Sequence, residues 1–309
     1  MLLALTRAVP RSIDRCELTH LDRTPIDYSR AVEEHARYEA ALGEMGCRLE
    51  RLPEAPDQPD SVFVEDTAVV FDDLAVIARP GAASRRGEVA ATVAALSRHR
   101  RLAFIQAPGT LDGGDVLVVN FSGGDPGTPP SSLRSARASS LAPLHPRGCV
   151  FVGDTPRTNA EGARQLAEFV SPLDYEVVRL PVTKCLHLKS AVTNLSCEAG
   201  TRGTIGTSTS GTAVTYRTRG TLLINRDWID AEPFAGFDLI DVDPSEPAAA
   251  NVLAIGGRVL CADEFPRTRG RVEASGFVTL SVPAGELAKA EGGLTCGSLV
   301  VPIFNTRPA

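Results

Sequence analysis

The chain has 309 residues, of which 43% are hydrophobic and 23% charged, and its formal net charge is −6. This composition is typical of a globular protein with a sizeable core, and the negative charge argues against a general affinity for nucleic-acid backbones. No apolar run is long enough to span a bilayer, so we expect no membrane partner.

The cysteines and histidines give no sign of a disulfide framework or a zinc site. The seven cysteines are scattered, no two form a C-x-x-C pair, and the five histidines are never paired at ligand spacing. This usage favours a reducing compartment, and we expect a cytoplasmic protein. The apolar start is broken by Arg7 and Pro10, so it does not resemble a signal peptide.

The first part of the chain reads as a strand, a helix, a hairpin and a second helix. Apolar positions recur at helical spacing up to Gly46, and two later apolar runs flank an Asp-Asp turn. These elements are expected at residues 3–9, 28–46, 61–79 and 87–98.

The same unit then repeats. Strands are expected at 116–119, 149–153, 191–195 and 221–224, a helix at 159–170, and a hairpin at 251–261, before a last strand that ends near 304. The hairpins open near residues 66, 115, 187, 251 and 296. Without two interrupting tracts the spacing is roughly 45–50 residues, a period at which a β-plus-helix unit is typical of a closed radial array.

The two interrupting tracts are low in complexity. Residues 121–147 are rich in Gly, Pro, Ser and Arg, and residues 199–220 in Thr, Gly and Ser. The composition predicts disordered or weakly ordered surface insertions, and a translated intron is an alternative origin. We assign these tracts no function.

Polar residues gather at the ends of predicted strands, which packing alone would not require. Asp60, Glu65 and Asp66 place three carboxylates within seven residues, the last two beside apolar runs. A buried carboxylate needs a cationic partner from the protein or from a ligand. A solvated turn is the alternative, more so for Asp60 than for Asp66.

Three further stretches carry reactive side chains. Asp112 precedes two glycines, which let a backbone approach another group closely; an ordinary turn is the alternative. His187 lies between two leucines, where an isolated histidine is more often a core residue than a catalyst. Cys296 lies in a Gly-rich stretch before an apolar run, as an exposed nucleophile on a rigid element would, although most such cysteines are buried apolar residues.

Together these stretches indicate one site. Cys296, His187 and Asp112 supply a nucleophile, an acid–base group and an orienting carboxylate, each at the opening of a different repeat. Arg85 and Arg157 add two forked cations suited to a carboxylate. Acidic and basic clusters in one site call for a zwitterion with an additional cationic end.

The chain resembles the dimethylarginine dimethylaminohydrolases (dimethylargininases) of the guanidino-group-modifying, amidinotransferase-like superfamily. The resemblance implies an α+β fold, a five-bladed α/β propeller of pentein type with pseudo-fivefold ββαβ repeats and its site on the central axis. It implies one catalytic domain over 1–309 that carries the two insertions. The matching stretches, in family order, are 4–10, 62–70, 79–86, 110–116, 157–159, 186–190 and 294–296.

The resemblance also assigns roles by position. Cys296 would be the nucleophile, His187 the general acid–base and Asp112 its orienting carboxylate. Asp66 would hold the guanidinium, and the backbone near Ala290 would line the guanidinium side. The two arginines would bind the α-carboxylate. The α-amino end and the edge of the pocket would be held by Asp60, the backbone at Leu18, which lies on a mobile lid, and Glu65. The substrate-binding positions are thus Leu18 (backbone), Asp60, Glu65, Asp66, Arg85, Arg157 and Ala290 (backbone).

The implied reaction converts Nω,Nω-dimethyl-L-arginine or the monomethyl compound to L-citrulline and an amine, through a covalent thiouronium on Cys296. It needs no metal and no organic cofactor, and its only partner is the small methylated arginine. Arginine deiminase is a rival, although it normally carries an added helical domain for which this chain has no room. An amidinotransferase, a cysteine peptidase and a disabled guanidine-binding propeller are the others. The oligomeric state stays open, a homodimer being one option, and the second insertion puts closure of the His187 repeat in question.

Overall fold

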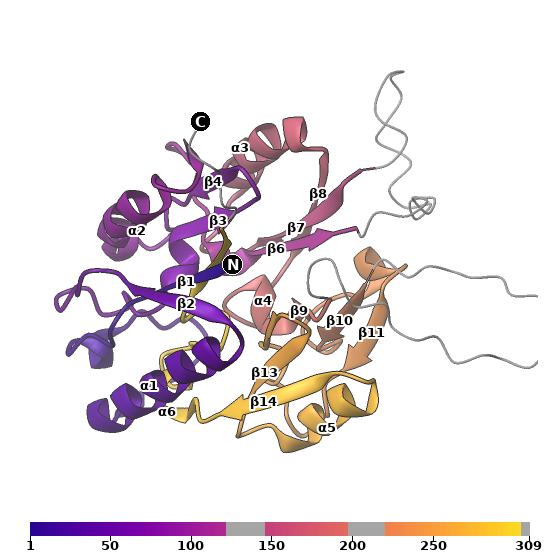
Figure 1. Ribbon diagram of the computed structural model, residues 1–309. Helices are drawn as coiled ribbons and strands as arrows, with labels where there is room; N and C mark the ends of the chain where they lie inside the picture. Colours follow the sequence, from indigo (N-terminus) through magenta and orange to yellow (C-terminus); the bar gives the residue numbers. More distant parts are fainter. Residues whose placement is uncertain (122–145, 197–219, 304–309) are drawn as a thin grey trace, which may run out of the picture.

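Five small sheets surround a common centre, with the longer helices on the outside (Figure 1). The structure is a computed structural model that describes residues 1–121, 146–196 and 220–303. Each sheet has three strands, and its middle strand pairs antiparallel with one neighbour and parallel with the other. The predicted five-bladed arrangement of ββαβ repeats is confirmed.

The strands follow the chain from sheet to sheet, except that the last strand joins the first sheet. That sheet holds β15 (Leu299–Pro302), β1 (Leu2–Thr6) and β2 (Cys47–Arg51). The others, in chain order, are β3 (Ala68–Val70), β4 (Leu74–Ile77) and β5 (Arg101–Phe104); β6 (Val116–Asn120), β7 (Gly148–Asp154) and β8 (Tyr175–Pro181); β9 (Val192–Asn194), β10 (Thr221–Ile224) and β11 (Asp238–Asp241); and β12 (Leu253–Ile255), β13 (Arg258–Ala262) and β14 (Val278–Val282).

Helices form the parallel crossovers of four repeats. They are α1 (Tyr28–Glu44), α2 (Val89–Leu96), α3 (Ala160–Val170) and α5 (Pro266–Ala274), and two short helices, α4 (Leu188–Ala191) and α6 (Gly285–Ala288), lie between strands. Side-chain caps start two of them, because Asp27 accepts a hydrogen bond from the Arg30 amide and Asn159 one from the Gly162 amide. In the fourth repeat a 3-10 turn (Glu232–Phe234) replaces the helix. That crossover is short and contains Pro233 and Gly236, both of which disfavour a helix interior.

The repeats pack against one another through five apolar clusters, one at each junction between neighbouring sheets. The junction of the first and last repeats, for example, buries Leu42 of α1 against Leu260 of β13, and that of the third and fourth buries Phe151 against Phe234. The other three clusters join the first and second, second and third, and fourth and fifth sheets. Burial of this kind is the main stabilising term of a fold. A ring of five junctions without a gap is therefore a closed array.

The interrupting tracts lie between paired strands. Residues 122–145 of the first tract and 199–219 of the second lie outside the described residues. The prediction that these tracts are disordered therefore stays a prediction. Their flanks are joined: the Phe121 amide donates to the Arg147 carbonyl at 2.9 Å, and the Leu195 amide to the Thr221 carbonyl at 2.9 Å. Because β9 pairs antiparallel with β10, the repeat after His187 is closed.

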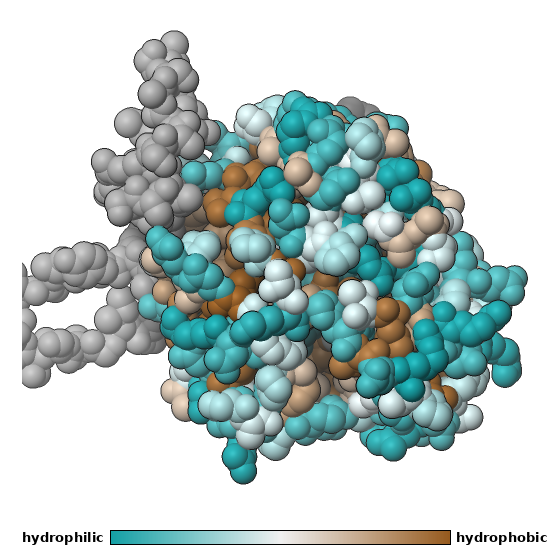
Figure 2. All heavy atoms as spheres, turned by 180° about the vertical axis from the view of Figure 1, so that it is seen from behind, coloured by the Kyte–Doolittle hydropathy of each residue, from teal (hydrophilic) through white to brown (hydrophobic). Residues whose placement is uncertain are grey.

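Figure 2 shows one face as largely hydrophilic, with apolar areas separated by polar side chains. Within the described residues, no helix is long and apolar enough to cross a membrane.

Candidate active site

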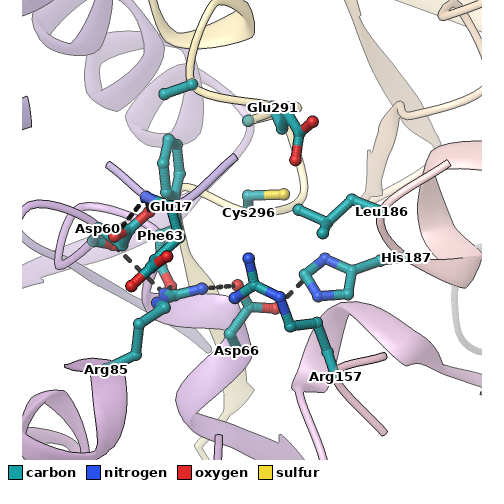
Figure 3. A pocket seen from close by; sticks show the side chains of 12 residues that line it. Glu17, Asp60, Phe63, Asp66, Arg85, Arg157, Leu186, His187, Glu291 and Cys296 are labelled. Carbon is teal, nitrogen blue, oxygen red and sulfur yellow. Dashed lines mark hydrogen bonds and ion pairs between the residues drawn. The ribbon is translucent and has the colours of Figure 1, made fainter. Parts of the chain in front are cut away.

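One pocket collects side chains from loops of several repeats (Figure 3). Seven of the ten residues singled out from the sequence line it: Asp60, Asp66, Arg85, Arg157, His187, Ala290 and Cys296. Asp112 lies behind His187, Glu65 lies behind Cys296, and Leu18 is half-buried in a segment that covers the pocket. Pocket-lining residues up to 279 positions apart in the chain (17 to 296) thus meet in one place.

His187 stands between two buried carboxylates. Its Nε2 is 3.2 Å from Asp112 Oδ2, and its Nδ1 is 3.8 Å from Asp66 Oδ1. Burial alone would lower the pKa of His187, but the negative charges of Asp66, Asp115 and Asp112 raise it to about 9. The imidazole is therefore protonated at neutral pH, and Asp112 is placed to orient it.

Asp66 forms part of a buried ion cluster with Arg85. Arg85 Nη1 lies 2.6 Å from Asp66 Oδ2, and its Nη2 lies 2.9 Å from Glu88 Oε2. Burial would raise the pKa of Asp66, but the cationic His187 and then Arg85 hold it below its usual value. Arg85 is only 3% exposed and its Nη2 also donates to the Phe63 carbonyl, so every nitrogen of its guanidinium has a protein partner.

Cys296 carries a protonated thiol in this environment. Its side chain is 7% exposed, and the Gly293 amide donates to Sγ at 3.4 Å. Burial, followed by the charges of Glu65 and Asp66, raises the pKa of Cys296 to about 12. A cation that entered the pocket beside Sγ would favour the thiolate, whereas the free site does not.

Glu65 binds the segment that carries Cys296 from the side away from the pocket. Its Oε1 is 2.6 Å from Lys189 Nζ, and its Oε2 accepts a hydrogen bond from the Thr295 hydroxyl at 2.6 Å. Its own amide donates to the Cys296 carbonyl at 3.1 Å. Both carboxylate oxygens are thus engaged by the protein, and Glu65 does not line the pocket.

Asp60 and Arg157 lie where the chain after β1 crosses the pocket. Both Asp60 carboxylate oxygens accept from the Glu17 amide at 3.2 Å, and Arg157 Nη2 donates to the Thr19 hydroxyl at 3.3 Å. Leu18, between these two contacts, packs against the apolar cluster that contains Phe63 and Cys296. The chain at Leu18 therefore covers the site in this structure.

The glycines of the Asp112–Asp115 stretch allow the close approach expected of them. A Cβ on Gly113 would lie 2.0 Å from the Glu65 carbonyl oxygen, and one on Gly114 would lie 2.6 Å from His187 Nδ1. At Gly113 only glycine fits, because a Cβ would clash with backbone atoms, which cannot rotate away as a side chain can.

Several functional neighbours were missed from the sequence. Glu88 pairs with Arg85, Lys189 with Glu65, and Asp115 accepts from the Leu188 amide at 3.0 Å, next to His187. Burial raises the pKa of Asp115 to about 6. Glu291 lines the pocket. The available signals were the spacing of Glu88 three residues after Arg85, and the positions of the others inside or beside the motifs already noted.

One set of groups has metal-ligand character within the described part of the chain. Atoms of Asp66, Asp112 and His187 lie within 4.8 Å of one another. Arg85 and the Gly114 amide already bind Asp66, and the Gly81 amide donates to Asp112 at 2.9 Å. The protein's own cations and amides thus balance the charge of this set, so the residues do not form an open metal site.

Comparison with known proteins places this geometry in a family, although no protein-family model matches the chain. The chain is 35% identical over 283 residues to the N(G),N(G)-dimethylarginine dimethylaminohydrolase of Streptomyces coelicolor, across 91% of this chain and 90% of that protein. It is 31% identical over 300 residues to the protein of the same name from Pseudomonas aeruginosa, across 96% and 97%. The chain belongs to the dimethylarginine dimethylaminohydrolase family. It is thus a hydrolase-like member of the pentein superfamily, as its resemblance predicts.

Solved structures agree with this membership of the dimethylarginine dimethylaminohydrolase family. A variant of the Pseudomonas aeruginosa enzyme in complex with citrulline aligns with a TM-score of 0.76 and 28% identity, across 96% of this chain and 98% of that one. The N-terminal domain of ArgZ, a cyanobacterial arginine dihydrolase, aligns with a TM-score of 0.72 but only 16% identity, so it shares the fold alone.

Proposed function

We propose that the protein is a dimethylargininase, which hydrolyses Nω,Nω-dimethyl-L-arginine and Nω-monomethyl-L-arginine to L-citrulline and dimethylamine or methylamine. The observation that carries the proposal is the convergence of Cys296, His187 and Asp66 on one pocket that also holds Asp60 and two arginines. A cysteine peptidase would have no use for these charges. The closed ring of sheets supports residues 1–309 as one catalytic domain.

In this proposal, substrate binding replaces the partners of the charged side chains in the pocket. The substrate guanidinium takes the place of Arg85 beside Asp66, and the freed Arg85, with Arg157, receives the α-carboxylate. The α-amino group goes to Asp60, which accepts the Glu17 amide in the free protein. Each buried charge keeps a counter-charge throughout, so binding leaves no ion unpaired.

The bound cation then activates the cysteine. Its positive charge offsets Glu65 and Asp66, the thiol loses its proton to solvent, and the thiolate attacks the guanidinium carbon. Protonated His187 donates its proton to the departing amine as the C–N bond breaks, which leaves an S-alkylthiouronium on Cys296. Neutral His187 then takes a proton from water, whose oxygen attacks the same carbon, and the C–S bond breaks to release citrulline.

A substrate panel tests the proposal. Purified protein is given the asymmetric dimethyl compound, the monomethyl compound and unmethylated arginine, and citrulline is measured for the wild type and for Cys296→Ser. We expect citrulline from the methylated substrates and none from the variant. Turnover of arginine alone would favour a deiminase, and no turnover of any guanidine would favour a binding protein.

A further inference from the structure

The carboxylate of Glu291 holds the chain segment that covers the pocket. Glu291 lines the pocket, and its side chain accepts hydrogen bonds from three consecutive backbone amides, those of Thr19 at 3.0 Å, His20 and Leu21 at 2.7 Å. These residues belong to the segment 16–23, called the lid segment here. Three amide dipoles directed at one charge form a strong, charge-assisted contact.

Glu291 is fixed relative to the cysteine. It takes a left-handed backbone conformation (φ 58°), which is strained for a residue with a side chain. The next residue, Gly292, lies against the Phe63 ring, where a Cβ would be 2.3 Å away, and its amide donates to the Leu287 carbonyl. The loop that carries Cys296 therefore presents the Glu291 carboxylate in one position.

The lid segment's other contacts to the pocket depend on groups that the substrate needs. The Glu17 amide binds Asp60, and the Thr19 hydroxyl accepts from Arg157. In the proposed reaction Asp60 and Arg157 turn to the amino and carboxylate groups of the substrate, so the lid segment gives up both contacts. The Ser84 hydroxyl bound to Glu17 and the carboxylate of Glu291 are not required by the substrate.

We infer that Glu291 is a positioning residue that keeps the lid segment closed over bound substrate. This inference rests on the proposed function only for the identity of the substrate. When the lid segment opens, the Glu291 carboxylate loses its three amides and, like Asp60, is an acidic group in the lining of the pocket. There it attracts a cationic guanidine, so the same charge favours entry and closure.

Hydrogen–deuterium exchange without substrate gives the direct test. We expect the amides of residues 19–21 to exchange at least tenfold faster in Glu291→Ala and in the isosteric Glu291→Gln, because a neutral amide oxygen accepts these bonds more weakly. Glu33→Gln, on the exposed face of α1, is the control with the same change of charge and should exchange as the wild type. Exchange at 19–21 that is unchanged in the Gln variant would overturn the inference, even if the Ala variant fails to fold.

Kinetics give the second readout. We expect both Glu291 variants to raise KM about tenfold while kcat changes less than threefold, because closure is weakened and the reacting groups are intact. A raised KM without faster exchange at 19–21 would mean that Glu291 contacts the substrate directly, and the lid role would be wrong. Should the wild type turn over no guanidine, the proposed function fails, and the exchange measurement still decides the role of Glu291.

Discussion

At the scale of single residues, the site holds its two reactive groups in opposite states. Burial and the charges of Glu65 and Asp66 keep the Cys296 thiol protonated. The charge of Asp66, together with those of Asp115 and Asp112, keeps His187 protonated. In the free site Cys296 is therefore a thiol and His187 an imidazolium, and the thiol is a weak nucleophile until a cation enters. Such a site protects the thiol from unwanted alkylation and oxidation, since only a thiolate reacts quickly.

The reactivity of Cys296 should therefore increase when Glu65 is neutralised. Glu65→Gln removes the charge that, after burial, raises the thiol pKa most, and it frees the ammonium of Lys189. We expect the pKa of Cys296 to fall by at least one unit, a tenfold rise in thiolate at a given pH. The rate of iodoacetamide labelling of the Cys296 peptide, measured by mass spectrometry across pH, gives this value. An equal or higher pKa in Glu65→Gln than in Glu33→Gln would contradict the expectation.

The pH dependence of turnover should report His187. In the proposed reaction the free enzyme carries a Cys296 thiol and a His187 imidazolium. The thiol must lose its proton to solvent before the thiolate attacks, so the reacting state has one proton fewer. The value of kcat/KM should then rise with pH and level off near the pKa of His187, about 9, where the free enzyme has already lost one proton. Asp112→Asn removes a charge that raises this pKa, so its profile should level off at a lower pH. A break at the same pH in both proteins would show that His187 is not the group observed.

Single residues differ in how far the sequence reveals them. Cys296, His187, Asp112 and the acidic cluster could be singled out because polar groups stood at the ends of strands, and the structure brings them together in and around the pocket. Glu291 could not, because its partners lie 270 to 272 positions away and are backbone amides, which carry no sequence signal. The Arg85–Asp66 pair was likewise not specified, since the acidic cluster indicated a cation from the protein or from a ligand without deciding between them.

At the scale of elements, close-packed turns set the geometry of the site. The 3-10 turns Val64–Thr67 and Gly113–Asp115 lie side by side, and Gly113 meets the Glu65 backbone. That contact places Asp66 within reach of the Gly114 amide, 2.9 Å from Oδ1. The position of one charged residue thus depends on the absence of a side chain in another repeat.

A methyl group at Gly113 should disrupt this junction. The ideal Cβ lies 2.0 Å from one carbonyl oxygen and 3.0 Å from another, both backbone atoms. We expect Gly113→Ala to lower the free energy of unfolding by about 3 kcal/mol or more. Gly43→Ala is the matched control: Gly43 lies in α1 with nothing within 4 Å of its Cβ, and alanine there should stabilise by about 0.5–1 kcal/mol. Equal midpoints of urea unfolding for Gly113→Ala and wild type would refute the packing argument.

Elements were predictable where local patterns determine them. The spacing of apolar residues located α1, α2 and α3 to within two residues at each end, and the hairpins of β3–β4 and β12–β13 followed from paired apolar runs. No helix was predicted from the local pattern of the fourth repeat, and its crossover, which contains Pro233 and Gly236, forms only a 3-10 turn. Repetition was a weaker guide than local composition there.

At the scale of the whole molecule, the ring closes through its ends. β15 pairs antiparallel with β1, with Leu5 opposite Leu299 and Leu2 opposite Pro302. This pairing could be expected from the repeat count and the resemblance but not from any local pattern. It also places the Cys296 loop, just before β15, next to the first repeat and its lid segment. The site is therefore complete only where the two ends of the ring meet, because Cys296 and the lid segment come from opposite ends of the chain.

The paired flanks of the two interrupting tracts lead to the last prediction. Asn120 pairs with Gly148, Leu222 with Asn194, and the Thr221 amide donates to the Ser196 hydroxyl, so each tract starts and ends on adjacent strands. Replacing 122–145 and 197–219 by short Asn-Gly turns should therefore keep all five sheets. Shorter connections reduce the entropy lost on folding, and we expect the free energy of unfolding to rise by about 1–2 kcal/mol for each. Urea unfolding measures that gain, and citrulline formation from dimethylarginine should match the full chain. A folded variant that makes no citrulline would assign these tracts a part in the reaction, and an unfolded one would show that the repeats need them to close.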